Sequence, residues 1–361
     1  MKSQELPDLH VPLLQWYDAH ARTLPWRDDP TPYRVWISEI MLQQTRVDTV
    51  MPYFERFIKV LPAVRDLAAV EEERLLKLWE GLGYYHRAKN LKKAAVQIME
   101  KYAGELPPSF EELKKLPGIG PYSAGAIASI AFGARVPAVD GNVLRVIARI
   151  TANGGDIGQK DVRRDIEEDV MKILPYRRTG DFNQALMELG ATVCLPNREP
   201  VCHVCPVSSL CDAYGKGIQS LLPVKSKRNA RRIENRTVFV ILRDGRGAVR
   251  KRPEKGLLPG LWELPNVEGC LTPEQCEKVL QAWNIVSEGI EPLCSSEHIF
   301  THIQWHMTGY LVHAEGCRTD AISGAARGDD MSWATLEEMK EKFALPSAFR
   351  AYTRILKNLL K

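Results

Sequence analysis

The segment Leu116-Pro-Gly-Ile-Gly-Pro-Tyr-Ser-Ala124 decides the fold expected for the first half of this chain. Gly118 and Gly120 flank one apolar residue, so the backbone can turn tightly there and come close to a ligand. We expect a short helix to end before these glycines and a second helix to begin near Tyr122. The free N–H groups at the start of that second helix suit a phosphate group.

This arrangement is typical of helix-hairpin-helix motifs, which bind DNA without reading its sequence. A plain turn between two packed helices would also place Gly-x-Gly at this position. The full pattern, with the run of small residues that follows from Ala124 to Ala134, favours DNA binding. Ser109, with Glu112 three residues later, predicts a capping box at the start of the first helix.

Outward from this motif, residues 1–217 are predicted to be helical, because apolar residues recur three and four positions apart. The segments with this spacing are Val11–Ala19, Val35–Thr45, Leu75–Trp79, Leu91–Tyr102 and Val162–Leu174.

The pattern changes after residue 235. Thr237–Leu242 is rich in β-branched residues, and the turn signal Asp244-Gly245 separates it from a returning strand that ends at Arg252. Another strand is expected at His306–His313. Helices are expected at Glu274–Trp283 and Leu336–Phe343, so residues 235–361 are predicted to form an α+β domain.

The composition narrows the class of protein. With 361 residues, 45% of them hydrophobic and 26% charged, the chain is expected to form two or three folded domains. The uncharged, small-residue segment Pro121–Ala134 is too short to span a bilayer, and the first twenty residues do not resemble a signal peptide. We expect a monomer that is cytoplasmic (in a bacterium, associated with the nucleoid) or otherwise intracellular. Six basic residues against one acid in Lys225–Arg236 indicate an exposed linker that could also lie near phosphates.

The cysteines are unevenly distributed. There are eight in the chain, none of them before residue 194, and four fall close together at Cys194, Cys202, Cys205 and Cys211. In a chain without an export signal, such a cluster predicts a metal site rather than a disulfide framework. Four thiolates can hold a zinc ion or an iron–sulfur cluster, and the spacing alone does not choose between them.

Two carboxyl groups are candidates for acid–base chemistry. Glu39 lies in the apolar segment Trp36–Thr45, where desolvation would raise its pKa, as a general acid requires; a position on an exposed stripe is the alternative. Asp140 precedes a predicted helix, where it could simply be an N-cap. Amides at that helix start would favour its ionised form at neutral pH. Gln43 and Gln44 suit hydrogen bonding to bases.

The second domain offers two short motifs, Leu257–Pro265 and Phe300-Thr301-His302. The first contains Gly, Trp and Pro, and either a ligand-facing loop or a rigid turn would explain it. The paired glutamates that would hold magnesium for an active nucleotide pyrophosphohydrolase do not follow it, which argues against that activity. A non-catalytic DNA binder with a structural zinc is a further alternative.

Together these residues resemble the helix-hairpin-helix DNA glycosylases that carry an iron–sulfur cluster, and most of all the adenine DNA glycosylases of the MutY type. The matching segments are Leu24–Arg27, Glu39–Thr45, Gly81–Tyr85, Leu116–Tyr122, Val139–Val143, Met187–Ala191, the four cysteines and, in a Nudix-like domain, Gly260–Pro265. The resemblance implies residues 1–24 and 131–217 as a cluster domain and 25–130 as a six-helix module, with DNA across the cleft between them. A basic linker (218–234) and a Nudix-like domain that recognises 8-oxoguanine (235–361) follow.

The resemblance also implies the activity: release of adenine mispaired with 8-oxoguanine or guanine in duplex DNA, with one [4Fe-4S] cluster on the four cysteines. Glu39 would protonate the adenine, Asp140 would stabilise the sugar cation, and Tyr122 would support both. The implied DNA contacts are Trp26, Arg27 and Gln184 near the extruded base, Gln44, Thr45, Leu82, Gly83 and Tyr84 in the base stack, Gly118, Gly120 and Tyr122 in the hairpin, and Phe300, Thr301 and His302 at the oxidised base.

This sequence departs from the family pattern in two places. The first gap between the cluster cysteines has seven residues where the family usually has six, and Thr301 stands where a serine is common. The rival readings are an endonuclease III-type glycosylase with lyase activity and a mismatch thymine glycosylase. The lyase would need a lysine amine at the start of the second hairpin helix, where this chain has Tyr122.

Overall fold

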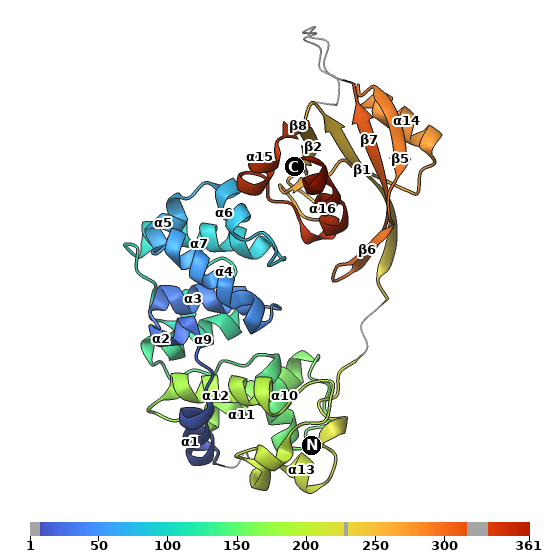
Figure 1. Ribbon diagram of the computed structural model, residues 1–361. Coiled ribbons are helices and arrows are strands. Elements are labelled where there is room, and N and C mark those ends of the chain that lie inside the picture. Colours follow the sequence, from blue (N-terminus) through green and yellow to red (C-terminus); the bar gives the residue numbers. More distant parts are fainter. Residues whose placement is uncertain (1–7, 227–229, 316–330) are drawn as a thin grey trace. The chain divides into compact units, whose positions relative to one another are not determined.

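The computed structural model describes residues 8–226, 230–315 and 331–361 (Figure 1). Packing divides the chain into two units. The helical unit consists of Met1–Val70 and Lys89–Arg228, and the sheet unit consists of Glu71–Ala88 and Asn229–Lys361. This division follows packing alone, so the domain boundaries expected from the sequence stay a prediction.

The first half of the chain is helical, as predicted. Its helices are α1 (His10–His20), α2 (Pro25–Asp28), α3 (Pro32–Leu42), α4 (Val47–Val60), α5 (Val64–Ala69), α7 (His86–Lys101), α8 (Phe110–Leu113), α9 (Pro121–Phe132), α10 (Gly141–Ile150), α11 (Lys160–Ile173), α12 (Thr179–Thr192) and α13 (Asp212–Gly215). Single turns of 3-10 helix lie at Cys202–Val204, Ser208–Leu210 and Gln219–Leu221.

The small residues of α9 let neighbouring segments approach closely. A Cβ on Gly125 would lie 2.1 Å from the carbonyl oxygen of Pro137, and one on Gly180 of α12 would lie 2.6 Å from that of Ser129 in α9. Both distances are shorter than van der Waals contact, so a side chain at either glycine would push the segments apart. This packing holds α9 against the Pro137 segment and against the start of α12.

The capping box predicted at Ser109 is wrong. Ser109 does occupy the N-cap position of α8, but its side chain accepts no capping hydrogen bond. Glu112 instead accepts hydrogen bonds from the Tyr102 hydroxyl at 2.8 Å and from Lys115 Nζ at 2.6 Å. A partner from the segment directly after α7 therefore satisfies this carboxylate in place of the N-cap N–H group.

The second half is α+β, also as predicted. Its strands are β1 (Arg232–Arg243), β2 (Arg246–Lys251), β3 (Trp262–Glu263), β4 (Asn266–Glu268), β5 (Ser287–Pro292), β6 (Ser296–Ile299), β7 (Ile303–Ala314) and β8 (Met331–Ala334). The sheet runs in the order β3-β2-β1-β7-β5, with β1 and β7 parallel. The helices of this unit are α6 (Glu72–Leu78), α14 (Pro273–Ala282), α15 (Leu336–Glu341) and α16 (Arg350–Leu359), and a 3-10 turn lies at Ser347–Phe349.

Alternate residues of β1 face opposite helices. Val238 and Val240 pack in a core with Tyr352 of α16, whereas Phe239 and Ile241 pack in a second core with the side chains of α14. This alternation follows from the two-residue period of a strand. The sheet therefore separates two cores, with α14 on one face and α16 on the other (Figure 1).

None of the helices in the described ranges is long and apolar enough to cross a membrane.

Candidate active site

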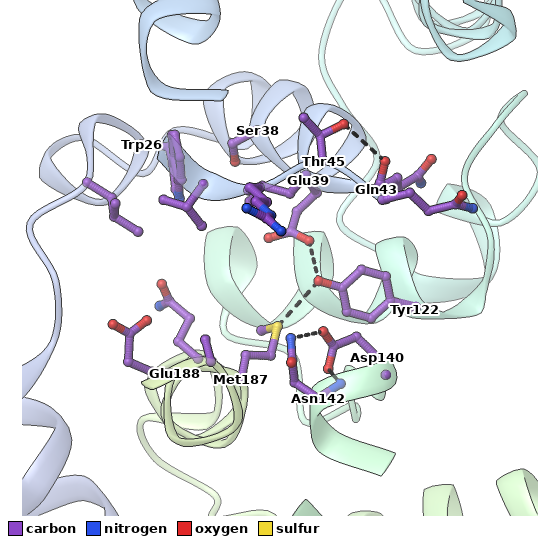
Figure 2. A pocket seen from close by; sticks show the side chains of 18 of the residues that line it. Trp26, Ser38, Glu39, Gln43, Thr45, Tyr122, Asp140, Asn142, Met187 and Glu188 are labelled. Carbon is purple, nitrogen blue, oxygen red and sulfur yellow. Dashed lines mark hydrogen bonds between the residues drawn. The ribbon is translucent and has the colours of Figure 1, made fainter. Parts of the chain in front are cut away.

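A pocket of about 970 Å³ opens in the helical unit (Figure 2). The starts of α9 and α10, the side of α12 and parts of α2 and α3 supply its walls. Of the site residues expected from the sequence, it brings together Trp26, Arg27, Glu39, Gln44, Thr45, Tyr122, Asp140 and Gln184. These residues are spread over more than 150 positions of sequence, so the fold assembles the site.

Glu39 lies on α3 and is buried. The Tyr122 hydroxyl donates a hydrogen bond to Glu39 Oε2 at 2.6 Å and contacts Met187 Sδ at 3.3 Å (Figure 2). Burial raises the pKa of Glu39 to about 7; the Tyr122 hydrogen bond opposes this, while the charge of Asp140 adds to it. The expected burial of Glu39 and the direction of its pKa shift are therefore confirmed.

Asp140 is the N-cap of α10, and its side chain caps the helix fully. Oδ1 accepts hydrogen bonds from the N–H groups of Asn142 and Val143, both at 2.8 Å, and Oδ2 accepts one from Asn142 Nδ2 at 2.7 Å. These amides stabilise the charged form, as expected. Burial acts in the opposite direction and raises the pKa of Asp140 above its usual value.

A buried arginine connects Asp140 to the cysteine segment. Arg145 Nη2 donates to Asn142 Oδ1 at 2.9 Å, and Arg145 Nε donates to the carbonyl oxygen of Cys194 at 2.8 Å. Asn142 in turn holds Asp140. The contacts of Asn142 and Arg145 were not predicted from the sequence, although an arginine among the apolar residues of α10 is a signal that could have indicated them.

A second group of charged side chains, Arg22, Arg27 and Glu188, also lines the pocket. Glu188 is almost completely buried and accepts from Arg22 Nε at 2.6 Å and from Arg27 Nη2 at 2.8 Å. Burial alone would raise the pKa of Glu188, but the two arginines outweigh it and the pKa is lowered. Arg27 Nε also donates to Gln184 Oε1 at 3.2 Å, so this carboxylate positions two of the predicted base contacts. Arg22 and Glu188 were not identified from the sequence.

The remaining predicted contacts lie elsewhere. Gly118 and Gly120 form the turn before α9, and Gly118 has a φ of 79°, which glycine adopts without strain. In the sheet unit, Leu82, Gly83, Tyr84, Phe300, Thr301 and His302 line a cavity of about 580 Å³. The hydroxyls of Tyr84 and Thr301 are 3.5 Å apart there.

The four clustered cysteines line one small cavity next to α10. Arg149 Nη1 lies 3.2 Å from Cys194 Sγ, and the Cys211 thiol donates to the Arg149 carbonyl oxygen at 3.4 Å. Burial raises the pKa of Cys205 to about 12 and also raises those of Cys202 and Cys211, so these thiols favour the neutral form until a cation joins them.

The donor set at this cavity consists of four sulfurs, which suits zinc or iron. In the described ranges, no three potential ligands are spaced as they would be around one metal ion. A four-iron cluster binds each thiolate through a different iron, so its ligands need not approach one another as closely.

Comparison with known proteins supplies the family. Residues 37–172 match the family described as HhH-GPD superfamily base excision DNA repair protein, and residues 237–354 match the NUDIX domain family. The adenine DNA glycosylase of Rattus norvegicus is 35% identical over 398 residues, covering 94% of this chain and 77% of that protein. This chain belongs to the adenine DNA glycosylase family. It is therefore a DNA glycosylase of base excision repair, and the resemblance noted in its sequence is confirmed.

Solved structures resemble the first part of this glycosylase. A thermostable thymine-DNA glycosylase is 29% identical with a TM-score of 0.51, covering 57% of this chain and 94% of that one. A non-covalent endonuclease III–DNA complex is 26% identical with a TM-score of 0.50, covering 58% of this chain and 97% of that one. The roles assigned to individual residues of the enzyme stay predictions.

Proposed function

We propose that this glycosylase hydrolyses the N-glycosidic bond of adenine that is mispaired with 8-oxoguanine or guanine in duplex DNA. The observation that carries the proposal is the buried, hydrogen-bonded pair of Glu39 and Tyr122 in one pocket with Asp140. Breaking a glycosidic bond needs an acid for the leaving group and a carboxylate for the developing sugar cation. In this pocket Glu39 is the candidate for the first role and Asp140 is the candidate for the second.

Glu39 is the proposed acid. With a pKa of about 7, a large fraction of this carboxyl is protonated near neutral pH and can give its proton to the extruded adenine. The base must leave the duplex to reach it, since a stacked base is inaccessible. A positioned acid of this kind contributes about 10²–10⁴-fold in rate. The Tyr122 hydroxyl holds the carboxyl in place.

Asp140 is the proposed stabiliser of the sugar cation. Its two oxygens are fixed by Asn142 and by the start of α10, so the carboxylate does not have to reorganise as charge develops. Asn142 is fixed in turn by Arg145. This chain of hydrogen bonds makes Asn142 and Arg145 positioning residues for Asp140.

The proposed enzyme removes the base without efficient strand cleavage. A lyase needs an amine that forms a Schiff base with the sugar. The start of α9 presents the Tyr122 hydroxyl to the pocket, and no lysine is among the described residues that line it. Borohydride should therefore trap no covalent complex between wild-type protein and DNA.

The cavity of about 580 Å³ in the sheet unit, called the second cavity below, is the proposed binding site for the oxidised base. Phe300 can stack on a base, while Thr301 and His302 can hydrogen-bond its edge. Tyr84 from the loop after α6 lines the same cavity. We propose that 8-oxoguanine binds here and that guanine binds less well.

One [4Fe-4S] cluster is proposed on Cys194, Cys202, Cys205 and Cys211. The all-sulfur donor set and the shared cavity support it. When bound, the cluster would close the cysteine loop. Arg145 and Arg149 would then tie that loop to α10, since both donate hydrogen bonds to it.

The test is base release from four duplexes, containing A·8-oxoguanine, A·G, G·T and thymine glycol. We expect fast adenine release from the first, slower release from the second, and no release from the other two. Thymine release from G·T would instead support a mismatch thymine glycosylase, and strand cleavage at thymine glycol would support an endonuclease III-type glycosylase with lyase activity. A duplex with A·T serves as the undamaged control.

A further inference from the structure

The loop that carries Tyr84 is attached to the C-terminal part of the chain by two charged side chains. Lys77, in the last turn of α6, has a side chain that is only 14% exposed. Its Nζ lies 2.5 Å from Glu80 Oε2 and 2.9 Å from each of the carbonyl oxygens of Met339 and Phe343. An ammonium group has three N–H donors, so all of them have acceptors.

The Met339 carbonyl lies in the last turn of α15, and Phe343 lies two residues beyond the end of that helix. The last carbonyls of a helix lack partners within the helix and carry partial negative charge, which a cation stabilises. Glu80 completes the attachment, because its second oxygen, Oε1, accepts a hydrogen bond from the N–H group of Leu345 at 3.0 Å. Lys77 and Glu80 thus bind one continuous segment, Met339–Leu345, at three backbone groups. We call this pair the clip.

The clip lies next to two of the segments that line the second cavity. Glu80 directly precedes the Gly81–Tyr84 loop, and Leu345 directly precedes Pro346–Ala348; both segments line the cavity together with Phe300–His302. A movement of Met339–Leu345 relative to α6 would therefore move the two walls relative to each other.

The Gly81–Tyr84 loop would move together with α6, because side-chain hydrogen bonds hold its backbone in place. Trp79 Nε1 donates to the Gly83 carbonyl oxygen, and Arg87 Nη2 donates to those of Leu82 and Gly83, each at 3.1 Å. Tyr84 has a φ of 47°, a conformation that needs support from its surroundings.

We propose that the clip of Lys77 and Glu80 is a specificity-determining device: it sets the position of Tyr84 relative to Thr301 and thereby the preference for 8-oxoguanine over guanine. This rests on the proposed reading of the oxidised base in the second cavity. Lys77 and Glu80 are positioning residues, since neither lines the cavity as described.

The test compares Lys77→Met with Lys251→Met. Met keeps the length of the stem but removes the three donors. Lys251 is the matched control because it also joins the α6 segment to the sheet, through Glu73 at 2.9 Å, yet both partners of that pair are well exposed. Exposed ion pairs contribute little to the stability of a fold. We expect Lys77→Met to lower single-turnover release from A·8-oxoguanine about tenfold, to leave release from A·G within about twofold, and Lys251→Met to change neither.

Two further variants separate positioning from simple loss of stability. Lys77→Arg keeps the cation and its donors, and should recover most of the preference. Combining Lys77→Met with Thr301→Ala should cost no more preference than the stronger single variant, because both act on one contact. Equal loss of release from both duplexes, in step with a lower melting temperature, would overturn the proposal.

Hydrogen exchange at the Leu345 amide tests the clip independently of the substrate. It should accelerate at least tenfold in Lys77→Met and stay unchanged in Lys251→Met. If the wild-type protein releases no adenine from A·8-oxoguanine, the proposed function fails, and with it the assigned role in preference. Unchanged exchange in Lys77→Met would show that the clip does not hold this segment, whatever the activity.

Discussion

The Tyr122 hydroxyl lies 2.6 Å from Glu39 Oε2, and this contact joins the first turn of the hairpin's second helix to the proposed acid. It acts on the acid in two opposite ways. The same packing that brings Tyr122 close removes water and raises the pKa of Glu39, whereas the hydrogen bond itself lowers it. The helix that follows the Gly118–Gly120 turn therefore also adjusts the pKa of the proposed proton donor.

Glu39→Gln should abolish adenine release while DNA binding survives. The amide keeps the shape of the carboxyl but has no proton to give. In the wild type, the rate should fall as the pH rises through about 7, because the protonated carboxyl is the active form. Single-turnover rates from pH 5.5 to 9 would measure this. Activity of Glu39→Gln within tenfold of the wild type would remove Glu39 as the acid.

The same substitution should stabilise the fold at high pH. The pKa of Glu39 is higher in the folded state than in the unfolded state. The free energy of unfolding is therefore highest below about pH 4.5, and this stability is lost as the pH rises through about 7. Gln carries no charge at any pH. Glu39→Gln should therefore be more stable than the wild type by on the order of 1–3 kcal/mol at pH 8, with the difference shrinking toward pH 5. Urea unfolding at the two pH values would measure it, and an equal difference at both would contradict this account.

Asp140→Asn should lose at least about a hundredfold in adenine release, since a neutral amide cannot stabilise the sugar cation. Its melting temperature should change little, because asparagine is as good an N-cap as aspartate. The two measurements separate charge from capping. Asp140→Ala, which loses both, is the comparison that should also lower the melting temperature. Near-normal activity in Asp140→Asn would show that the carboxylate acts only as a cap.

The sequence predicted much of this site because its chemistry follows short motifs. Glu39, Tyr122 and Asp140 each lie within a recognisable segment, and the helices that hold them have clear apolar periods. Ser109 shows the limit of local reasoning: its spacing to Glu112 was right for a capping box, but the Glu112 carboxylate accepts a hydrogen bond from Tyr102, directly after α7, instead.

Contacts across long stretches of sequence could not be predicted. Arg22 and Glu188 are 166 positions apart in the sequence, and Lys77 and Met339 are 262 positions apart, so no local sequence pattern predicts either contact. The net pKa shift of Asp140 could not be predicted for a related reason, since it depends on how deeply the fold buries that residue.

The wild-type protein should contain about four iron atoms per chain and absorb in the visible, the composition of the proposed cluster. Cys205→Ser should lose most of this iron and fold poorly, because closing the cysteine loop is part of the stability of that region. Cys276→Ser is the control: this thiol is buried in the other unit, at α14, and its loss should leave the iron content unchanged. Zinc without iron in the wild-type protein would contradict the cluster.

The double variant Thr301→Ala, His302→Ala should lose the preference for 8-oxoguanine over guanine while the chemistry of adenine release survives. Both side chains line the second cavity, and one good polar contact to a base edge is worth about 1–3 kcal/mol of discrimination. The ratio of release rates from A·8-oxoguanine and A·G should therefore fall roughly ten- to a hundredfold. Salt-dependent binding to undamaged DNA should remain, because phosphate contacts supply it. His313→Ala, at an exposed position on β7, is the control and should change neither quantity. If the ratio held and salt-dependent binding collapsed, Thr301 and His302 would be phosphate contacts and not readers of the base.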